Sequence, residues 1–194
     1  MFRFLAAPYL QEFEDKSPEK ILKRSVDILD TTIFSFFLNY VSNSQASPGG
    51  FKDRAGNADL YYTVFGWFTA DALGMKEECQ KVGPYVSGEI SRKNPEGVYL
   101  HCAAVLSSVT GMAREFKQSM GARLRKSEGM NEQMLYGAFL SLLSHYYLGD
   151  FRSIYRIRRR LTSLSMNDSL PCPVTAASLV LARSFRKPVD GIVD

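Results

Sequence analysis

The sequence predicts an all-α protein. Apolar residues recur at helical spacing, and no run alternates apolar and polar residues over the length of a strand. Turns that contain glycine or proline separate the apolar segments at steps of 47, 32 and 42 residues, from Gly50 to Gly97, to Gly129 and to Pro171. A pair of helices occupies about that length, so we expect about eight helices arranged as hairpins.

Length and composition limit the class of protein. A chain of 194 residues that is 45% hydrophobic can bury one full core, so we expect a single domain over residues 1–194, with residues 1–16 as an N-terminal extension. The net charge of +4 lacks the basic stripe expected of a nucleic-acid binder. No stretch reaches the length of a membrane span or a signal peptide. Three widely spaced cysteines favour a reducing compartment, so we expect a cytoplasmic protein.

The first long helix is expected from Ser17 to about Asn43. Ser17 can cap it, and Pro18 suits the first helical position. One face is marked by residues at helical spacing, namely Ile21, Leu22, Ser25, Ile28, Leu29, Thr32 and Phe36.

The next segment reads SPGGFKDRAGNADLYYTVFGWFTADALG. Its paired glycines allow a sharp turn, and Asn57 or Asp59 can cap the helix that follows and ends at Gly74. Aromatic residues cover more than one side of this helix, so we expect it to be buried and packed on two sides.

The later helices repeat this order of turn, apolar helix and closing glycine. Apolar helices are expected before Gly111, before Gly149 and in PVTAASLVLARSF, with amphipathic segments at about 76–90, 112–126 and 151–164. Because buried and amphipathic helices alternate, we expect an arc with an inner and an outer layer.

The order GGF, polar loop, DLYYT and closing LG resembles one repeat of the protein prenyltransferase β-subunit and squalene/terpene cyclase family. The resemblance is best over Ser17 to Gly74, and later units carry EGV, EGM and LPCP in place of GGF. It implies an α/α toroid-like arc of inner and outer helices, here a partial barrel, around an apolar funnel that holds isoprenoid chains.

The catalytic motifs of that family are not found in this sequence. Its prenyltransferases hold zinc with an aspartate, a cysteine two residues later and a distant histidine, whereas the matching repeat here reads Asp59-Leu60-Tyr61. The D-x-D-D cluster of squalene-type cyclases does not occur. The resemblance therefore implies a catalytically degenerate protein that binds an apolar, isoprenoid-like ligand in its concave face. The alternatives are a prenyl-transfer or cyclisation enzyme completed by another chain, and a protein-interaction scaffold.

No cofactor is expected, because the possible zinc ligands lack the spacing of a metal site. The sequence has neither C-x-x-C nor H-x-x-x-H, and the adjacent His101 and Cys102 point about 100° apart on a helix. Burial as small apolar residues explains the cysteines better. His145 lies near a helix end, where the helix dipole favours a protonated imidazole, and we prefer this capping role to catalysis.

Candidates for the wall of a ligand pocket lie in the apolar helices and at their starts. They are Asp59, Tyr62, Trp67, Tyr99, His101 and Tyr136. Each alone fits an ordinary core, but a helix that is apolar all round has one side left after packing, and tyrosine hydroxyls suit a pocket wall.

Candidates for an anion site lie on the basic segment FRSIYRIRRRLTSL, where Arg152, Arg156 and Arg159 project away from an apolar face. A solvated outer helix is the simpler interpretation, and a diphosphate, acidic lipid or acidic partner is the alternative.

An arc that stops short of a ring leaves apolar ends. We expect the N-terminal MFRFLAAPYL to cover one end. A homodimer or another protein partner would then cover the other, through residues Val174 to Phe185.

Overall fold

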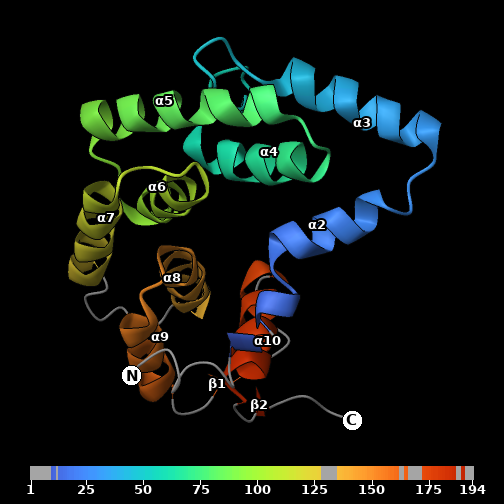
Figure 1. Cartoon of the computed structure of the whole chain (residues 1–194). Coiled ribbons are helices and arrows are strands. Elements are labelled where there is room, and N and C mark those ends of the chain that lie inside the picture. The colour runs from blue at the N-terminus through green and yellow to red at the C-terminus, as the bar shows by residue number, and fades with distance from the viewer. Residues whose placement is uncertain are drawn as a thin grey trace. The chain divides into compact units, whose positions relative to one another are not determined.

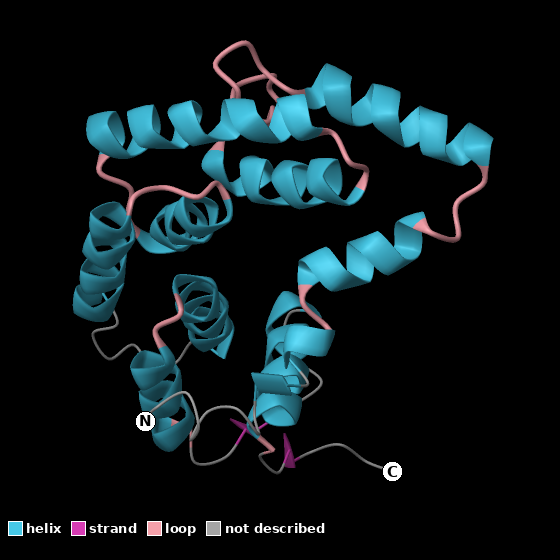
Figure 2. Cartoon of the chain, viewed as in Figure 1, coloured by secondary structure: helices cyan, strands magenta, loops and turns pink. Residues whose placement is uncertain are grey.

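The computed structural model describes residues 10–11, 13–127, 135–161, 164–165, 172–186 and 189–190. Most of them are helical (Figure 2), and the two-residue strands β1 (Leu164–Ser165) and β2 (Val189–Asp190) pair in parallel. The predicted all-α class is therefore confirmed. The chain divides into two compact units, which we call the middle unit (residues 16–120) and the terminal unit (residues 1–15 and 121–194).

The middle unit is built around one central helix. Its helices are α2 (Pro18–Val26), α3 (Thr31–Ser44), α4 (Leu60–Ala72), α5 (Lys76–Lys93), α6 (Gly97–Val109) and the first half of α7 (Arg114–Ser127) (Figure 1). Helix α4 contacts α2, α3, α5 and α6. It buries Val64 and Phe68 almost completely, and it leaves Tyr62 and Phe65 exposed. The prediction that this helix is packed on more than one side is confirmed.

The single helix predicted from Ser17 to Asn43 is wrong, because the chain breaks between α2 and α3. The carboxylate of Asp30 accepts hydrogen bonds from the backbone N–H groups of Thr32 and Ile33, at 2.8 and 2.9 Å, and so begins a new helix. The break also ends the predicted apolar face, since Ile28 is 83% exposed and Phe36 is 64% exposed.

The GGF loop joins α3 to α4 and rests on α5. Gly49 has a φ of +97°, and a Cβ at this position would collide with the carbonyl oxygen of Lys81. A Cβ on Gly50 would overlap the ring of Tyr85. The ring of Phe51 is buried and lies against Gly66 of α4, where a Cβ would also overlap it. The motif is therefore a packing device between the loop and two helices.

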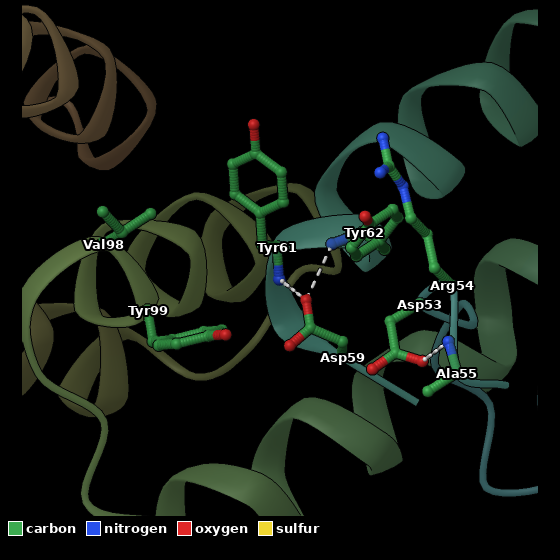
Figure 3. Close-up of a pocket in the computed structure, with 8 residues that line it drawn as sticks. All are labelled: Asp53, Arg54, Ala55, Asp59, Tyr61, Tyr62, Val98 and Tyr99. Atoms are coloured by element: carbon green, nitrogen blue, oxygen red, sulfur yellow. Dashed lines mark hydrogen bonds between the residues drawn. The ribbon is translucent and has the colours of Figure 1, made fainter. Parts of the chain in front are cut away.

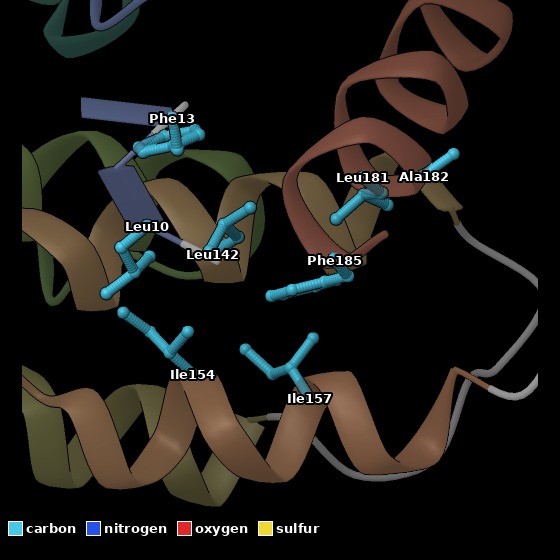
Figure 4. Packing of buried hydrophobic residues seen from close by; sticks show 8 residues of the cluster. All are labelled: Leu10, Phe13, Leu142, Ile154, Ile157, Leu181, Ala182 and Phe185. Carbon is cyan, nitrogen blue, oxygen red and sulfur yellow. The ribbon is translucent and has the colours of Figure 1, made fainter. Parts of the chain in front are cut away.

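The terminal unit has its own core. It contains the second half of α7, α8 (Leu135–Leu148), α9 (Phe151–Arg160) and α10 (Cys172–Phe185). Helix α8 contacts both α9 and α10. The buried cluster, drawn in Figure 4, consists of Leu10, Phe13, Leu142, Ile154, Ile157, Leu181, Ala182 and Phe185. Leu10 of the N-terminal segment packs in this cluster, whereas Phe2, Phe4, Leu5 and Tyr9 lie outside the described residues. That the segment covers an open end of an arc stays a prediction.

Helix α9 ends at Arg160 rather than near Leu164, because Leu161 adopts an extended backbone. The turn around Gly129 lies outside the described residues, and the arrangement of helices as an arc of inner and outer layers stays a prediction. Within the described part of the chain, no helix is long and apolar enough to cross a membrane.

Candidate functional site

A pocket of about 500 Å³ opens in the middle unit where the GGF loop meets the starts of α4 and α6. This volume lies within the usual range for sites that bind small molecules. The side chains that line it, drawn in Figure 3, are Asp53, Arg54, Ala55, Asp59, Tyr61, Tyr62, Val98 and Tyr99. Three tyrosines and two aspartates therefore line one space.

The start of α4 fixes one side of the pocket. The Oδ1 atom of Asp59 accepts hydrogen bonds from the backbone N–H groups of Tyr61 and Tyr62, at 2.8 and 3.1 Å. The prediction that Asn57 or Asp59 caps this helix is confirmed for Asp59. The rings of Tyr61 and Tyr62 pack edge to face with centroids 5.7 Å apart, so the cap and the aromatic wall are held by the same helical turn.

A tight turn in the loop holds the second carboxylate. The Oδ1 atom of Asp53 accepts from the backbone N–H groups of Ala55 and Asn57, at 2.8 and 2.9 Å. The loop is paired on both sides of this turn, by antiparallel bridges between Gln45 and Phe51 and between Lys52 and Ala58. Asp53 is therefore a fixed part of the wall rather than a side chain on a loose loop.

Tyr99, near the start of α6, closes the pocket opposite Asp59. Its side chain points toward the Asp59 carboxylate (Figure 3). The negative charge of the nearby Asp59 carboxylate raises the pKa of the Tyr99 phenol. The ring of Tyr99 remains 48% exposed.

The structure brings together three of the six residues predicted for the pocket wall, Asp59, Tyr62 and Tyr99. Trp67 and His101 lie on the same helices, α4 and α6, but do not line this pocket. Tyr136 belongs to the terminal unit, where its ring lies 6.3 Å from that of Phe139. Ligand binding by any of the six stays a prediction.

Sequence reasoning missed Asp53, Arg54, Ala55 and Val98, and it did not single out Tyr61. Helical periodicity carries no information about a loop that folds back on itself. A signal was nevertheless present in the sequence DRAG, because Asp at the first position and Gly at the fourth are typical of a tight turn.

The predicted anion-binding arginines lie on α9 in the terminal unit. Arg152 and Arg159 are exposed, and Arg156 is half-buried. The opposite face of α9 buries Ile154 and Ile157, so the predicted amphipathic pattern is confirmed for residues 151–160. An anion at these arginines stays a prediction.

The thiols have the environment of structural residues. Burial raises the pKa of Cys79 to about 11 and that of Cys102 to about 12, so both thiols stay protonated at neutral pH. Cys172 belongs to α10, and its side chain is outside the described residues. Among the residues that the structure places, no three side chains of His, Cys, Asp or Glu are grouped to hold a metal ion.

A polar cluster in the terminal unit has the composition of a hydrolytic triad but a different arrangement. Asp150 accepts hydrogen bonds at Oδ2 from Arg125, at 2.5 Å, and from the Ser153 hydroxyl, at 2.9 Å. His145 Nδ1 lies 3.4 Å from the same oxygen, and the imidazole is fully buried. The serine donates to the carboxylate, whereas a nucleophilic serine would donate to the imidazole. The cluster therefore joins α7, α8 and α9, and it does not have the geometry of a catalytic site.

Comparison of the chain with protein-family models, with curated proteins and with solved structures gives no match.

Proposed function

We propose that this chain is a ligand-binding protein, and that a small molecule with an apolar body occupies the pocket lined by Tyr61, Tyr62 and Tyr99. The observation that carries the proposal is the pocket itself, in which three tyrosine rings from two helices face about 500 Å³ of open volume. Tyrosine offers apolar area together with a hydroxyl that can direct a polar group of the ligand. An isoprenoid-like molecule is the first candidate, since the loop and helix that form the pocket are the segment that resembles the prenyltransferase and cyclase repeat.

Binding has more support than catalysis. The lining residues that the structure describes include no cysteine, histidine, serine or lysine, and the groups that could transfer a proton are two aspartates and three tyrosines. Oδ1 of each carboxylate already accepts two backbone hydrogen bonds that hold the local fold. A prenyl-transfer or cyclisation activity completed by a second chain would need groups that this pocket does not supply.

The proposal is tested by extraction and by titration. Purified protein is denatured, its organic extract is analysed by mass spectrometry, and farnesol is titrated into fresh protein while ¹H–¹⁵N correlation spectra are recorded. We expect saturable shifts of the backbone resonances of Tyr61, Tyr62 and Tyr99, and weaker binding in Tyr99→Ala. Tyr40→Ala is the matched control, because Tyr40 is 61% exposed on α3 in the same unit. Shifts spread over the surface, or unaffected by Tyr99→Ala, would count against this pocket.

An interaction scaffold is the second candidate, because α3 leaves a row of large apolar side chains in solvent. Ile33, Phe36, Phe37 and Tyr40 are between 37% and 64% exposed. Exposed apolar patches of this kind are uncommon on proteins without a partner. On α10, Leu179 and Val180 are also exposed, which supports the homodimer expected through this helix.

We also propose that the protein is cytoplasmic, as the three widely spaced cysteines lead us to expect.

A further inference from the structure

The pocket carries more negative than positive charge. Asp53 and Asp59 are carboxylates and Arg54 is the one cation among the lining residues that the structure describes, so the formal charge of the lining is −1 at neutral pH. No ion pair within the described part of the chain neutralises either carboxylate. Two carboxylates in the lining would repel a phosphate or diphosphate.

The aromatic rings favour the same sign of charge. The face of a tyrosine ring is electronegative and attracts a cation that lies over it, and pockets that hold quaternary ammonium groups are built from such rings. Tyr62 is 37% exposed and Tyr99 is 48% exposed, so the protein does not cover either side chain fully. Tyr61 is braced by the ring of Phe65, with centroids 5.0 Å apart.

The carboxylates are also held in place before any ligand arrives. Each uses Oδ1 to accept hydrogen bonds from two backbone N–H groups. A fixed site loses little side-chain entropy when a ligand binds. Since an isolated pair of aspartates with no third ligand is a poor metal site, an organic cation fits this lining better than a metal ion.

We infer that the pocket recognises an ammonium group, so that its ligand is an amphiphilic amine or quaternary ammonium compound with an apolar body. The cationic head would lie among the rings of Tyr61, Tyr62 and Tyr99, within reach of the charges of Asp53 and Asp59. This inference rests on the proposed function, because it names the chemical class of the ligand in the same pocket.

The test compares a cation with its neutral carbon isostere. Choline and 3,3-dimethyl-1-butanol have nearly the same shape and differ in charge, and each is titrated into the full chain while ¹H–¹⁵N correlation spectra are recorded. We expect choline to shift the resonances of Tyr61, Tyr62 and Tyr99 in a saturable way and to bind about tenfold more tightly than the neutral alcohol.

Two variants remove the charge without removing the hydrogen bonds. Asparagine caps helices and turns as well as aspartate does, so Asp53→Asn and Asp59→Asn should keep the fold and each weaken choline binding severalfold. Asp30→Asn is the matched control, because Asp30 caps α3 in the same unit and outside the pocket. It should leave choline binding unchanged.

Each other outcome overturns the inference in a distinct way. Equal shifts with both compounds would mean that the pocket binds apolar groups and does not distinguish a cation from a neutral group. The inference would then fail, and the proposed function would remain. Tighter binding of inorganic phosphate than of choline would mean that Arg54 and the helix starts make an anion site. If choline, the alcohol and farnesol all leave the pocket resonances unmoved, the inference and the proposed function both fail.

Discussion

The hydroxyl of Thr63 joins the pocket loop to α4. It accepts a hydrogen bond from the backbone N–H of Phe51, at 2.9 Å, and donates one to the carbonyl oxygen of Asp59, at 2.6 Å. Thr63 is fully buried, so no water can replace these bonds. Helical periodicity marks Thr63 only as one position on a face of α4. Its hydroxyl nevertheless holds both ends of the loop, at Phe51 and at Asp59.

Replacing Thr63 by valine tests this role. The change keeps the shape of the side chain but leaves the buried N–H of Phe51 without a partner, so we expect the free energy of unfolding to fall by about 1–3 kcal/mol. Thr63→Ser keeps the hydroxyl and should be closer to the native protein in melting temperature. Equal melting temperatures for the valine and serine variants would show that the hydroxyl is not needed.

Asp150 in the terminal unit makes stability depend on pH. The His145 imidazole, 3.4 Å away, and hydrogen bonds from Ser153 hold the pKa of its carboxyl well below the usual value, and Arg125 adds a further partner. A lowered folded-state pKa contributes stability that is present above the unfolded-state pKa of about 3.9 and is lost as the pH falls below it.

We expect Asp150→Asn to lower the free energy of unfolding at pH 7 by about 1–3 kcal/mol, because hydrogen bonds to a charged acceptor are lost. The difference from the native chain should shrink as the pH falls below about 4, because the unfolded chain then binds a proton at this carboxyl while the native carboxylate is still ionised. Urea unfolding at several pH values measures this difference in the free energy of unfolding. Asp27→Asn is the control, because Asp27 is exposed. A difference that stays constant with pH would contradict this account of Asp150.

The helices show how far the pattern of the sequence determines the fold. The cap of α4 and the burial of α4 on several sides were predicted from Asp59 and from the spread of apolar residues around the helix. The break before α3 was missed because Ile28 and Leu29 continue the apolar spacing across it. A single side-chain cap at Asp30 outweighed that spacing, and periodicity alone does not reveal such a cap.

The turn between α3 and α4 gives a prediction for a whole connection. We expect Gly49→Val combined with Gly50→Val to lower the free energy of unfolding by about 1–3 kcal/mol, because both side chains would enter α5 and Gly49 has a positive φ. Thermal melting measures the effect. The control is Gly88→Ala in α5, where the nearest atom to a new Cβ is Arg92 Nη2 at 3.6 Å. A double variant that melts with the native chain would show that the turn tolerates side chains.

At the scale of the whole molecule, the sequence predicted part of the pocket and not its boundaries. Asp59, Tyr62 and Tyr99 were predicted from their positions at or near the starts of two apolar helices. Asp53 and Val98 could not be, because their closeness to those residues depends on how the loop pairs with itself and on how α6 packs against α4. Tertiary contacts of this kind leave no periodic signal in one sequence.

The association predicted for the chain is tested through α10. Ala177, Leu181 and Phe185 are buried in the terminal unit, whereas Leu179 and Val180 face solvent. We expect the native chain to form a homodimer and Leu179→Arg combined with Val180→Glu to weaken it with little loss of helix content, since exposed positions tolerate charge. Sedimentation equilibrium measures both. A native chain of 21.8 kDa at high micromolar concentration would contradict the homodimer.

The contact between Phe51 and Thr63 has a consequence for dynamics. The loop cannot leave α4 without breaking this bond, and without the loop the pocket loses Asp53 and Arg54. Detachment of the loop and loss of the binding site are therefore one local opening reaction. A ligand that binds only the closed form must slow the exchange of the Phe51 amide hydrogen with solvent, in proportion to its occupancy. That single amide thus reports affinity for any compound, including one whose own signals cannot be observed.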